Sequence, residues 1–511
     1  MQHPSHAPAT SSHPIDRREL IAVAVITALG ALCRLVALRQ PMRYDEAVAW
    51  VGFIGQDWWT ILSEYPTPNN HVFFSLLAKA TSSLAPYQPW AIRLPALLPG
   101  IAIVPATWAV GRRLADRSTA LLGAALAAGS MPLVLYSTNA RGHSLVVLGG
   151  LALVLLGDRL RTRPAWLPGW VAYVVVAALG LWTAPLMIYS IAAVSLWLAL
   201  HSVWPALPGR SDASVATSAP AAVKLSLGAR LTAARSLLMR IVAADVMALA
   251  LAWLLYLPII RAAGLGAILA NKLVRPVPWP LFGKLLPPFL FELVVTWSAP
   301  LPPILAVVLV ALAAMGMPRA RRGGASFAFA AVAACLGLFL FSHAHPFVRV
   351  WLFFVPLFLL AVGRGLVRLQ ARWRSRTWLD PAWTAVALAV LVSGVALRTR
   401  AAEGTDDTGR FAAAREVTQV LAPQLQPGDR VLATIPLNGP LLWYFCERGL
   451  DTAALNTPLA TTRRAFLVLD PSRGQTLARA VEAGVIEPTL FREPTLLVRT
   501  TGAEVWRSER R

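Results

Sequence analysis

Long apolar stretches separated by short polar ones dominate the first 400 residues. Each stretch holds about 16–22 residues, close to the roughly 20 that an α-helix needs to cross the hydrocarbon core of a bilayer. The pattern predicts membrane-spanning helices near residues 20–38, 92–111, 118–135, 144–160, 166–181, 184–203, 238–259, 297–317, 325–342, 347–367 and 381–399. The predicted fold class is therefore a polytopic α-helical membrane protein with about eleven spans.

Two stretches need separate interpretation. The first, 20–38, follows Arg17 and Arg18, is too long for the core of a signal peptide and lacks a small-residue cleavage site. We expect it to remain as a membrane anchor. A further stretch, 70–86, is interrupted by Lys79 and by hydroxyl residues at 81–83, so it is interpreted as an interfacial helix.

Basic clusters between the stretches predict the orientation. If the N-terminus is cytoplasmic and 70–86 does not span, five consecutive basic segments fall on the cytoplasmic side, as the positive-inside rule requires. These segments lie near residues 112–117, 159–163, 224–235, 319–322 and 364–376. Counting 70–86 as a span would put all five outside, so eleven spans and an extracytoplasmic C-terminus are favoured.

Composition agrees with the membrane interpretation. The 511 residues are 57% hydrophobic and 14% charged, whereas soluble domains carry about 25% charged residues, and the mean hydropathy is +0.58. The net charge is +22, but residues 401–511 balance 13 Arg against 13 Asp and Glu, so the excess lies between the apolar stretches. That distribution argues against a nucleic-acid partner. Three scattered cysteines predict no disulfide framework.

The chain is predicted to have three parts. A cytoplasmic tail (1–19) precedes a transmembrane domain (20–400), which contains an outer loop at 40–91 and a flexible Ala, Ser and Pro-rich linker at 205–237. A small soluble α/β domain follows at 401–511. Its predicted strands lie at 428–434, 465–469 and within 488–500, and its predicted helices at 441–448 and 475–483.

Acidic residues are scarce outside the C-terminal segment. Of the five on the predicted outer face, four lie in the loop after the first span, and two of these, Asp45 and Glu46, are adjacent. A carboxylate near low dielectric can act as a general base or bind a divalent cation that neutralises phosphate. A solvated acidic loop is the alternative reading of the same residues.

Other polar residues share the predicted outer face. Asn69, Asn70 and His71 begin the interfacial helix, where they either bind a sugar or phosphate or cap the helix. Cations on this face run against the positive-inside bias, which either an anionic substrate or lipid headgroup contact would explain. The later outer loops supply Tyr136, Arg141, His143, Lys272, Arg275, His345 and Arg349.

The order of these motifs resembles the GT-C glycosyltransferases, in particular the family 39 and ArnT-like group of protein mannosyltransferases and aminoarabinose transferases. The similar features, over about residues 19–370, are Tyr44-Asp45-Glu46 after the first span, Asn70-His71, Arg93 to Leu97, Tyr136 to His143, and Arg349 with Pro356. The prolines that often follow the basic residue of the interfacial helix are absent here, because Val72 and Phe73 follow His71.

The resemblance implies an inverting glycosyltransferase on the outer face of a bacterial inner membrane. The donor would be a sugar on polyprenyl phosphate, and the acceptor a hydroxyl of a lipid, glycan or protein. Asp45 would be the catalytic carboxylate, as a base or through a bound Mg²⁺ or Mn²⁺, with Glu46 in support. Tyr44, Asn69, Asn70, His71, Tyr136, Arg141, His143, Arg275 and His345 would contact substrates, and Arg349 or Lys272 would hold the lipid phosphate.

A transporter or lipid flippase is the alternative. Such proteins place ionisable residues at mid-membrane. The predicted spans are nearly free of charge, with Asp245 as the exception. The pattern therefore favours an enzyme whose polar groups lie at the membrane surface.

Overall fold

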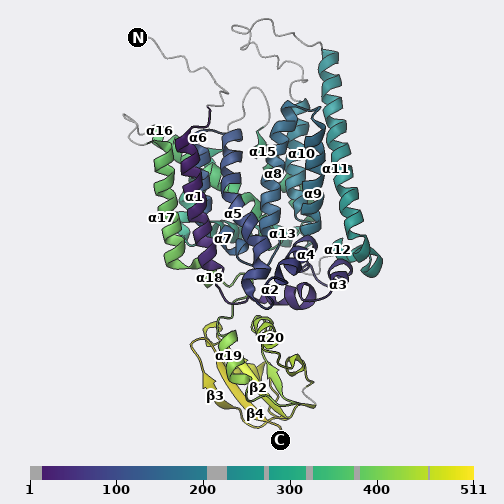
Figure 1. The fold of residues 1–511 in the computed structure, drawn as a ribbon, viewed down its shortest axis with the longest axis vertical. Coiled ribbons are helices and arrows are strands. Elements are labelled where there is room, and N and C mark those ends of the chain that lie inside the picture. The colour runs from purple at the N-terminus through teal and green to yellow at the C-terminus, as the bar shows by residue number, and fades with distance from the viewer. Residues whose placement is uncertain (1–13, 204–226, 270–274, 318–325, 373–379, 459–460) are drawn as a thin grey trace.

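The structure, a computed structural model, describes residues 14–203, 227–269, 275–317, 326–372, 380–458 and 461–511. A helical bundle forms the larger part, and a small C-terminal domain lies beyond one end of it (Figure 1). Residues 1–13 of the predicted tail, most of the predicted linker 205–237 and the candidate Lys272 lie outside the described residues.

The first half of the bundle runs to residue 203. Its elements are α1 (Arg17–Ala37), α2 (Tyr44–Ala49), the π-helical turn η1 (Trp50–Ile54), α3 (Trp58–Ser63), α4 (Val72–Ser82), α5 (Pro89–Leu114), α6 (Arg117–Gly129), α7 (Met131–Ser137), α8 (His143–Thr162), α9 (Leu167–Thr183) and α10 (Met187–Val203). The second half contains α11 (Leu227–Ala263), α12 (Gly266–Leu269), α13 (Trp279–Ser298), α14 (Pro303–Gly316), α15 (Phe327–Ser342), the 3₁₀ turn η3 (Val348–Phe354), α16 (Val355–Arg372) and α17 (Pro381–Thr399).

The polytopic helical fold is confirmed, although fewer helices reach full span length than predicted. Among the described residues, seven helices are long and apolar enough to cross a membrane, or eight if α6 and α7, bent by 59°, form one span. Four predicted spans form helices of only 14–17 residues, namely α9, α10, α14 and α15. α10 and α14 are shorter than their apolar runs because the first residues of each run lie outside the helix. Pro185 and Pro302 lie shortly before the first residues of α10 and of α14.

Two predictions about loops were wrong. The stretch 262–296, expected as an outer loop between the predicted spans 238–259 and 297–317, contains most of the 20-residue apolar helix α13, whose mean hydropathy of 1.2 is the lowest of the seven candidates. Glu292 and the Pro287-Pro288 pair interrupt the apolar run, so the sequence pattern did not predict this helix. Residues 227–237, expected in the flexible linker, form the start of α11, a helix of 37 residues.

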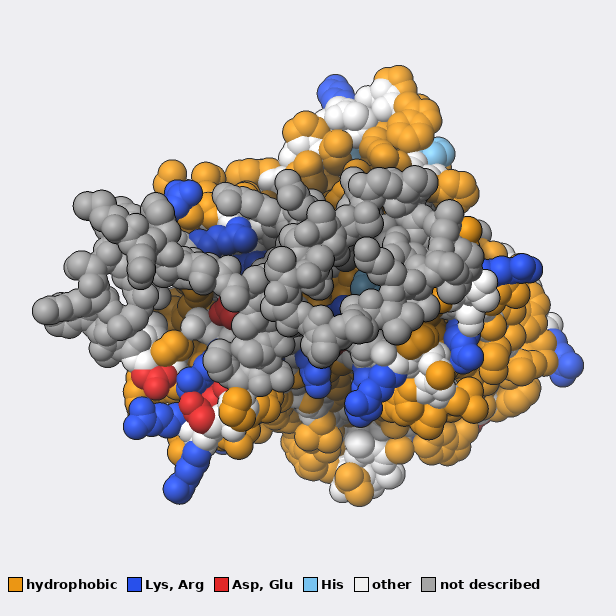
Figure 2. Space-filling view, turned by 90° about the horizontal axis from the view of Figure 1, so that it is seen from above, with side chains coloured by type: hydrophobic (Ala, Val, Ile, Leu, Met, Phe, Trp, Pro, Cys, Tyr) orange, Lys and Arg blue, Asp and Glu red, His pale blue; other side chains and the backbone are white. Residues whose placement is uncertain are grey.

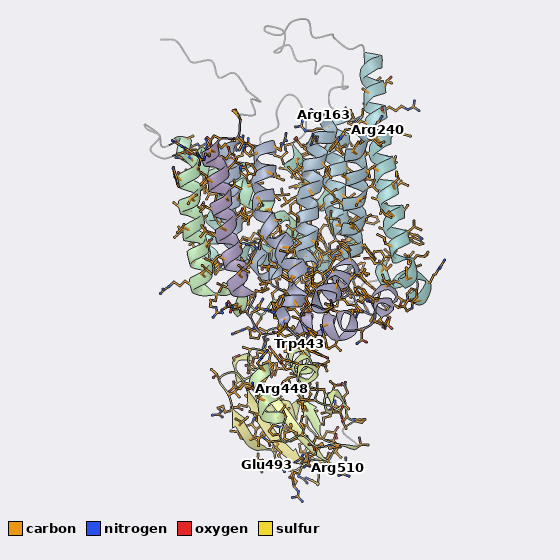
Figure 3. All side chains as sticks on the ribbon, viewed as in Figure 1. Arg163, Arg240, Trp443, Arg448, Glu493 and Arg510 are labelled. Atoms are coloured by element: carbon orange, nitrogen blue, oxygen red, sulfur yellow. The ribbon has the colours of Figure 1, made fainter. Side chains whose placement is uncertain are left out.

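The predicted interfacial stretch forms a short helix, and the basic residues gather at one end of the bundle. α4 has 11 residues, so at about 1.5 Å per residue it covers about half of a hydrocarbon core roughly 30 Å thick. Arg163 and Arg240 lie at the end of the bundle away from the C-terminal domain (Figure 3). Seen from that end, Lys and Arg outnumber Asp and Glu on the described surface (Figure 2).

Close packing joins α14 to α16, the helix that follows the turn holding Arg349. α14 and α16 approach until their backbones touch, because Gly316 and Gly365 have no side chain at the contact. A Cβ atom on Gly316 would lie 1.8 Å from the carbonyl oxygen of Ala361, so any larger residue would separate the two helices. The turn η3, which holds Arg349, leads directly into α16.

The C-terminal α/β domain is confirmed. Its described elements are α18 (Ala401–Gly404), α19 (Ala414–Leu421), β1 (Arg430–Leu432), α20 (Asn438–Glu447), η4 (Thr452–Leu455), β2 (Arg464–Leu469), η6 (Pro471–Arg473), α21 (Leu477–Glu482), β3 (Thr495–Arg499) and β4 (Glu504–Glu509). Within these residues the sheet order is β1-β2-β4-β3, with β1 parallel to β2 and the other pairs antiparallel. Trp443 lies where the domain meets the bundle (Figure 3), its ring centroid 4.7 Å from that of Trp50.

Candidate active site

The short helix α2 begins the site, and Glu46 fixes it in position. The backbone N–H of Arg43 donates to Glu46 Oε2 at 3.0 Å, closing the first turn. The Arg93 guanidinium of α5 donates to both Glu46 oxygens at 2.7 Å, and both side chains are fully buried. The N–H of Ala140 also donates to Glu46 Oε1 at 2.7 Å. Glu46 therefore joins α2 to α5 and to the loop before α8.

Asp45, the neighbour of Glu46, lies between two guanidinium groups. Its Oδ2 atom is 3.6 Å from Nη1 of Arg141 and 3.6 Å from Nη1 of Arg349. The backbone of Asp45 is held as well, because its N–H donates to the Thr408 carbonyl at 3.2 Å and its carbonyl accepts from Asn69 at 3.1 Å. The buried Oδ2 atom has no hydrogen-bond donor among the described residues, so it is free to accept a proton from an incoming hydroxyl.

Arg141 contacts His71 on its other side. Arg141 Nη2 lies 3.2 Å from His71 Nε2, while the N–H of Gly142 donates to His71 Nδ1 at 3.0 Å. A neutral imidazole that accepts at Nδ1 carries its proton on Nε2, so Nε2 cannot accept from Arg141 as well. The Nε and Nη1 atoms of Arg141 are buried without a hydrogen-bond acceptor in the described part of the chain. These guanidinium donors are available to an anion.

The electrostatics of His71 and Arg141 follow from burial. Burial holds the pKa of His71 well below its usual value, and the nearby charges of Arg141 and Arg349 lower that pKa further. Burial also lowers the pKa of Arg141, while Asp45 opposes that shift. The imidazole is therefore neutral near pH 7. The His143 ring, 5.0 Å from that of His71 between centroids, packs beside it.

Arg349 contacts a second carboxylate, which the sequence analysis missed. Asp407, in the segment between α18 and α19, has its Oδ1 atom 3.5 Å from Arg349 Nη1. Its Oδ2 atom accepts a hydrogen bond of 2.5 Å from the Tyr136 hydroxyl. Asp406-Asp407 repeats the pattern of Asp45-Glu46, two adjacent acids just after a predicted span. That signal could have identified Asp407 as a candidate.

A cavity of about 660 Å³ opens beside these groups. Its polar lining residues are Tyr136, Glu292, Thr296, His345, Arg349, Thr405, Asp406 and Asp407. The apolar lining comes from α7, α13, η3 and the turn before η3, and it includes Met131, Leu135, Leu285, Phe289, Val295, Pro346, Phe347 and Val348. A cavity with both apolar and charged lining groups suits an amphiphilic ligand.

Other predicted site residues have different surroundings. Asn70 donates to the carbonyls of Ile61 and Glu64 and accepts from Ser75, so its amide braces the outer loop. Tyr44 packs against Gly409 and Gly439 of the C-terminal domain. Arg275 is exposed, at a position ahead of α13. None of these three is among the residues that line the cavity.

The described residues contain no group of three or more His, Cys, Asp or Glu side chains that could hold a metal ion. Asp45, the predicted metal ligand, faces two guanidinium groups. Because a bound divalent cation would be repelled by both arginines at this carboxylate, the donor set around Asp45 does not fit a metal site.

The fold and this site define a polytopic membrane protein with a surface-facing polar site and an apolar cavity. Residues 70–210 match the family model for dolichyl-phosphate-mannose-protein mannosyltransferase. A comparison with curated proteins gives no significant match.

Two structures of ArnT from Cupriavidus metallidurans share the fold. The chain is similar to ArnT from Cupriavidus metallidurans bound to undecaprenyl phosphate, with 13% identity, a TM-score of 0.58 and coverage of 95% of this chain and 97% of that one. The apo structure of ArnT gives 14% identity and the same TM-score of 0.58. An oligosaccharyltransferase from Archaeoglobus fulgidus tethered to an acceptor peptide gives a TM-score of 0.48, with 12% identity and coverage of 96% of this chain and 74% of that one. The family match covers residues 70–210, and the likeness to ArnT shows a shared fold over most of both chains.

Proposed function

We propose that the protein transfers a sugar from a polyprenyl-phosphate donor to a hydroxyl group of a lipid, glycan or protein acceptor. The observation that carries this proposal is Asp45 held between Arg141 and Arg349, beside a cavity with an apolar wall. The relative ArnT, with the same fold, was crystallised with undecaprenyl phosphate. An apolar cavity suits the polyprenyl chain, and two guanidiniums suit its phosphate.

In this mechanism Asp45 is the general base. Its carboxylate takes the proton of the acceptor hydroxyl while that oxygen attacks the anomeric carbon of the sugar. The bond between the anomeric carbon and the phosphate oxygen breaks, and the phosphate leaves with the electron pair. Arg141 and Arg349 stabilise the charge that develops on the leaving phosphate. A single displacement of this kind inverts the anomeric configuration.

The proposed location is the extracytoplasmic face of a bacterial inner membrane. The site lies at the end of the bundle that carries the C-terminal domain, and Arg163 and Arg240 lie at the opposite end (Figure 3). The positive-inside rule assigns the basic end to the cytoplasm. Polyprenyl-linked sugars presented on the outer face would then reach Asp45 from the membrane.

The test is transfer of radiolabelled sugar from a panel of polyprenyl-phosphate donors to membrane acceptors. Asp45→Asn keeps the shape of the side chain and removes the base, so we expect transfer to fall at least about 100-fold, as for loss of a general base. Asp57→Asn is the matched control, because Asp57 caps α3 in the same outer loop and Asn is an equally good cap. Equal transfer by wild type and Asp45→Asn would contradict the proposed role of Asp45.

A transporter or flippase remains the second candidate on the strength of one feature, the acidic residue Asp245 inside the bundle. Its Oδ1 atom accepts from the Tyr173 hydroxyl at 2.9 Å and from the Ser195 hydroxyl at 3.1 Å. Transport of a lipid or solute that is lost in Asp245→Asn, together with no sugar transfer by the wild type, would favour that candidate over the enzyme.

A further inference from the structure

Asp407 and the proposed base Asp45 both face the guanidinium group of Arg349. Nη1 of Arg349 lies 3.6 Å from Asp45 and 3.5 Å from Asp407, so two carboxylates from opposite ends of the sequence face one nitrogen atom. Together with Arg141, the four groups carry two positive and two negative charges. The phosphate of a ligand must therefore compete with Asp407 for Arg349.

The segment that holds Asp407 is fixed against the bundle. The Arg43 guanidinium donates to the Thr405 carbonyl at 2.8 Å, and the Tyr44 N–H donates to the Gly409 carbonyl at 2.9 Å. Asn139 Nδ2 donates to the Thr408 hydroxyl at 3.0 Å. With its backbone held on both sides, Asp407 cannot turn away when a ligand arrives, so its charge acts on whatever Arg349 binds.

The same segment is tied to the C-terminal domain. Asp406, the residue before Asp407, forms a 2.5 Å ion pair with Arg473 of η6. Arg473 also donates to the Arg410 carbonyl at 2.9 Å. The position of Asp407 thus depends on both parts of the protein, since the segment bridges them.

The charge of the ligand changes during the proposed reaction. A polyprenyl-phosphate sugar is a phosphodiester with one negative charge, whereas the polyprenyl phosphate left after transfer is a monoester with about −1.5 to −2 at pH 7. A fixed carboxylate close to the phosphate site repels the product more strongly than the donor. Without such a group, two arginines would hold the product more tightly than the substrate.

We propose, on the basis of the proposed glycosyl transfer, that Asp407 is a positioning residue which competes for Arg349 and weakens binding of the polyprenyl-phosphate product, so that the product leaves. It acts through Arg349 and requires no contact with the sugar. Its Oδ2 atom accepts a hydrogen bond from the Tyr136 hydroxyl, while its Oδ1 atom lies 3.5 Å from Arg349.

The test uses the purified full-length protein and undecaprenyl phosphate as the probe. Asp407→Asn keeps the shape and a group that can bond Tyr136, but it removes the charge. Loss of one negative charge beside Arg349 predicts binding of undecaprenyl phosphate at least about tenfold tighter in the variant. Inhibition of transfer by undecaprenyl phosphate should strengthen by the same factor, while KM for the donor falls less and kcat decreases. Asp407→Glu, which restores the charge, should return all three towards wild type.

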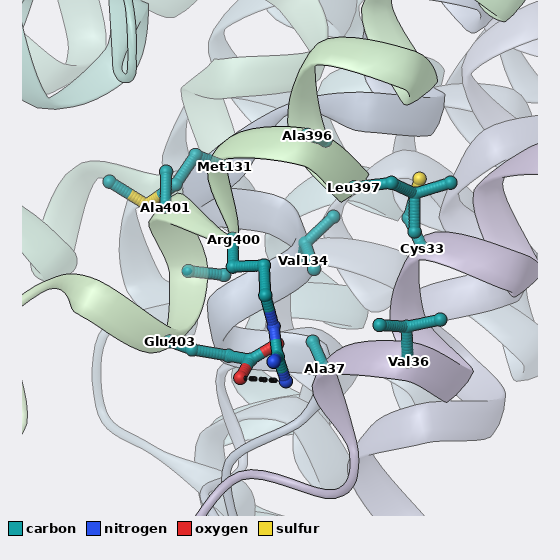
Figure 4. Close-up of a pocket in the computed structure, with 11 residues that line it drawn as sticks. Cys33, Val36, Ala37, Met131, Val134, Ala396, Leu397, Arg400, Ala401 and Glu403 are labelled. Carbon is teal, nitrogen blue, oxygen red and sulfur yellow. Dashed lines mark hydrogen bonds and ion pairs between the residues drawn. The ribbon is translucent and has the colours of Figure 1, made fainter.

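A matched control comes from the same segment of the chain. Glu403 pairs with Arg400 at 2.5 Å and lines a separate small cavity against α1, α7 and α17 (Figure 4). Glu403→Gln removes the same net charge without touching Arg349, so its affinity for undecaprenyl phosphate should equal that of wild type. A purely structural role of Asp407 predicts weaker binding in Asp407→Asn, the opposite of our expectation.

The outcomes separate this inference from the proposed function. Unchanged or weaker binding in Asp407→Asn, in a wild-type protein that transfers sugar, would overturn the role of Asp407 and leave the enzyme activity standing. A wild-type protein that transfers from no donor would overturn both. If Asp407→Asn does not accumulate in membranes, Asp407→Ser carries the same expectation, because it also removes the charge and keeps a hydroxyl near Tyr136.

Discussion

At the scale of single residues, buried Glu46 makes more hydrogen bonds to the surrounding structure than its neighbour Asp45 does through its side chain. All contacts of its carboxylate are to protein groups, namely the Arg93 guanidinium and the backbone N–H groups of Arg43 and Ala140. The adjacent Asp45 has a buried oxygen without a hydrogen bond in the described structure. Of these two adjacent acids, Glu46 stabilises the fold, and Asp45 has a carboxylate oxygen that can take part in a reaction.

Replacing Glu46 should therefore cost stability first. Glu46→Gln leaves Arg93 buried with its charge uncompensated, which costs about 3–5 kcal/mol. We expect a clear drop in the melting temperature of the detergent-solubilised protein, with loss of transfer as a consequence. Glu64→Gln, an exposed acid of the same outer loop, should melt like wild type. An unchanged melting temperature for Glu46→Gln would contradict the scaffold role.

His71 makes the stability of the protein depend on pH. Its pKa in the folded protein is lowered by burial and by Arg141 and Arg349, whereas in the unfolded chain it is near 6.5. The unfolded chain therefore takes up the proton first, and stability is lost as the pH falls below about 6.5, by up to about 1.4 kcal/mol per pH unit.

The measurement is the melting temperature between pH 7.5 and 5 for wild type and His71→Asn. Asn keeps an acceptor for the Gly142 N–H and cannot titrate. The variant should show a weaker decline on acidification. Parallel curves for the two proteins would assign the acid sensitivity to other groups.

At the scale of elements, helix contacts explain how residues distant in sequence meet. Arg349 reaches Asp45 from η3, and Arg141 reaches it from the loop before α8, while Asp407, in the segment after α18, contacts Arg349. Gly142 permits a close approach of its loop to α9 and to His71, because a Cβ atom there would clash with Thr183 and with His71 Nδ1. The site thus forms only when α4, α8 and α9 are packed together.

Asp245 of α11 accepts hydrogen bonds from α9 and α10 and so links three helices of the bundle. We expect Asp245→Ala to lower stability by about 1 kcal/mol, the usual size of hydrogen bonds between helices in a membrane, without loss of transfer. Asp245→Asn keeps an acceptor oxygen and should behave like wild type. The measurements are the melting temperature and the rate of sugar transfer of each variant, made on the same preparations. Intact stability in Asp245→Ala would contradict the structural role.

The elements were predictable from sequence to different degrees. Apolar runs gave α1, α5, α8, α16 and α17 near their true positions, because hydropathy over about 20 residues is a direct measure of membrane burial. α13 was missed, since its charges and prolines lower the apolar average, and two of them, Pro288 and Glu292, line the cavity. The segment 227–237 was assigned to a linker by its composition, although it continues into a regular helix.

At the scale of the whole molecule, Arg43 connects the bundle to the C-terminal domain. It is 2% exposed, and its guanidinium donates to the carbonyls of Ala402, Glu403 and Thr405. Burial lowers the pKa of Arg43 to about 10, which leaves it charged at neutral pH. Because it directly precedes Tyr44 and Asp45, the attachment of the domain and the geometry of the proposed base are coupled.

Arg43→Met should loosen this attachment. Each lost hydrogen bond to a charged donor is worth about 1.5–3 kcal/mol, so we expect faster cleavage by trypsin near residues 400–410 and reduced transfer. Arg499→Met, which breaks an exposed ion pair within the domain, should change neither. Wild-type rates of proteolysis and transfer in Arg43→Met would contradict the coupling.

The sequence by itself determined that the protein lies in a membrane, that its fold is helical, and that an α/β domain follows at the C-terminus. Each of these properties depends on hydropathy, charge or residue pattern within a window of about 20 residues, so no long-range contact is needed to predict it. The sequence also singled out Asp45, Arg141 and Arg349 as polar groups on one face. Only the tertiary structure decided that they meet, that Glu46 and Asn70 serve the scaffold, and that Asp407 joins them. Contacts across 50 to 360 residues depend on how helices pack, and no local pattern in one sequence encodes that packing.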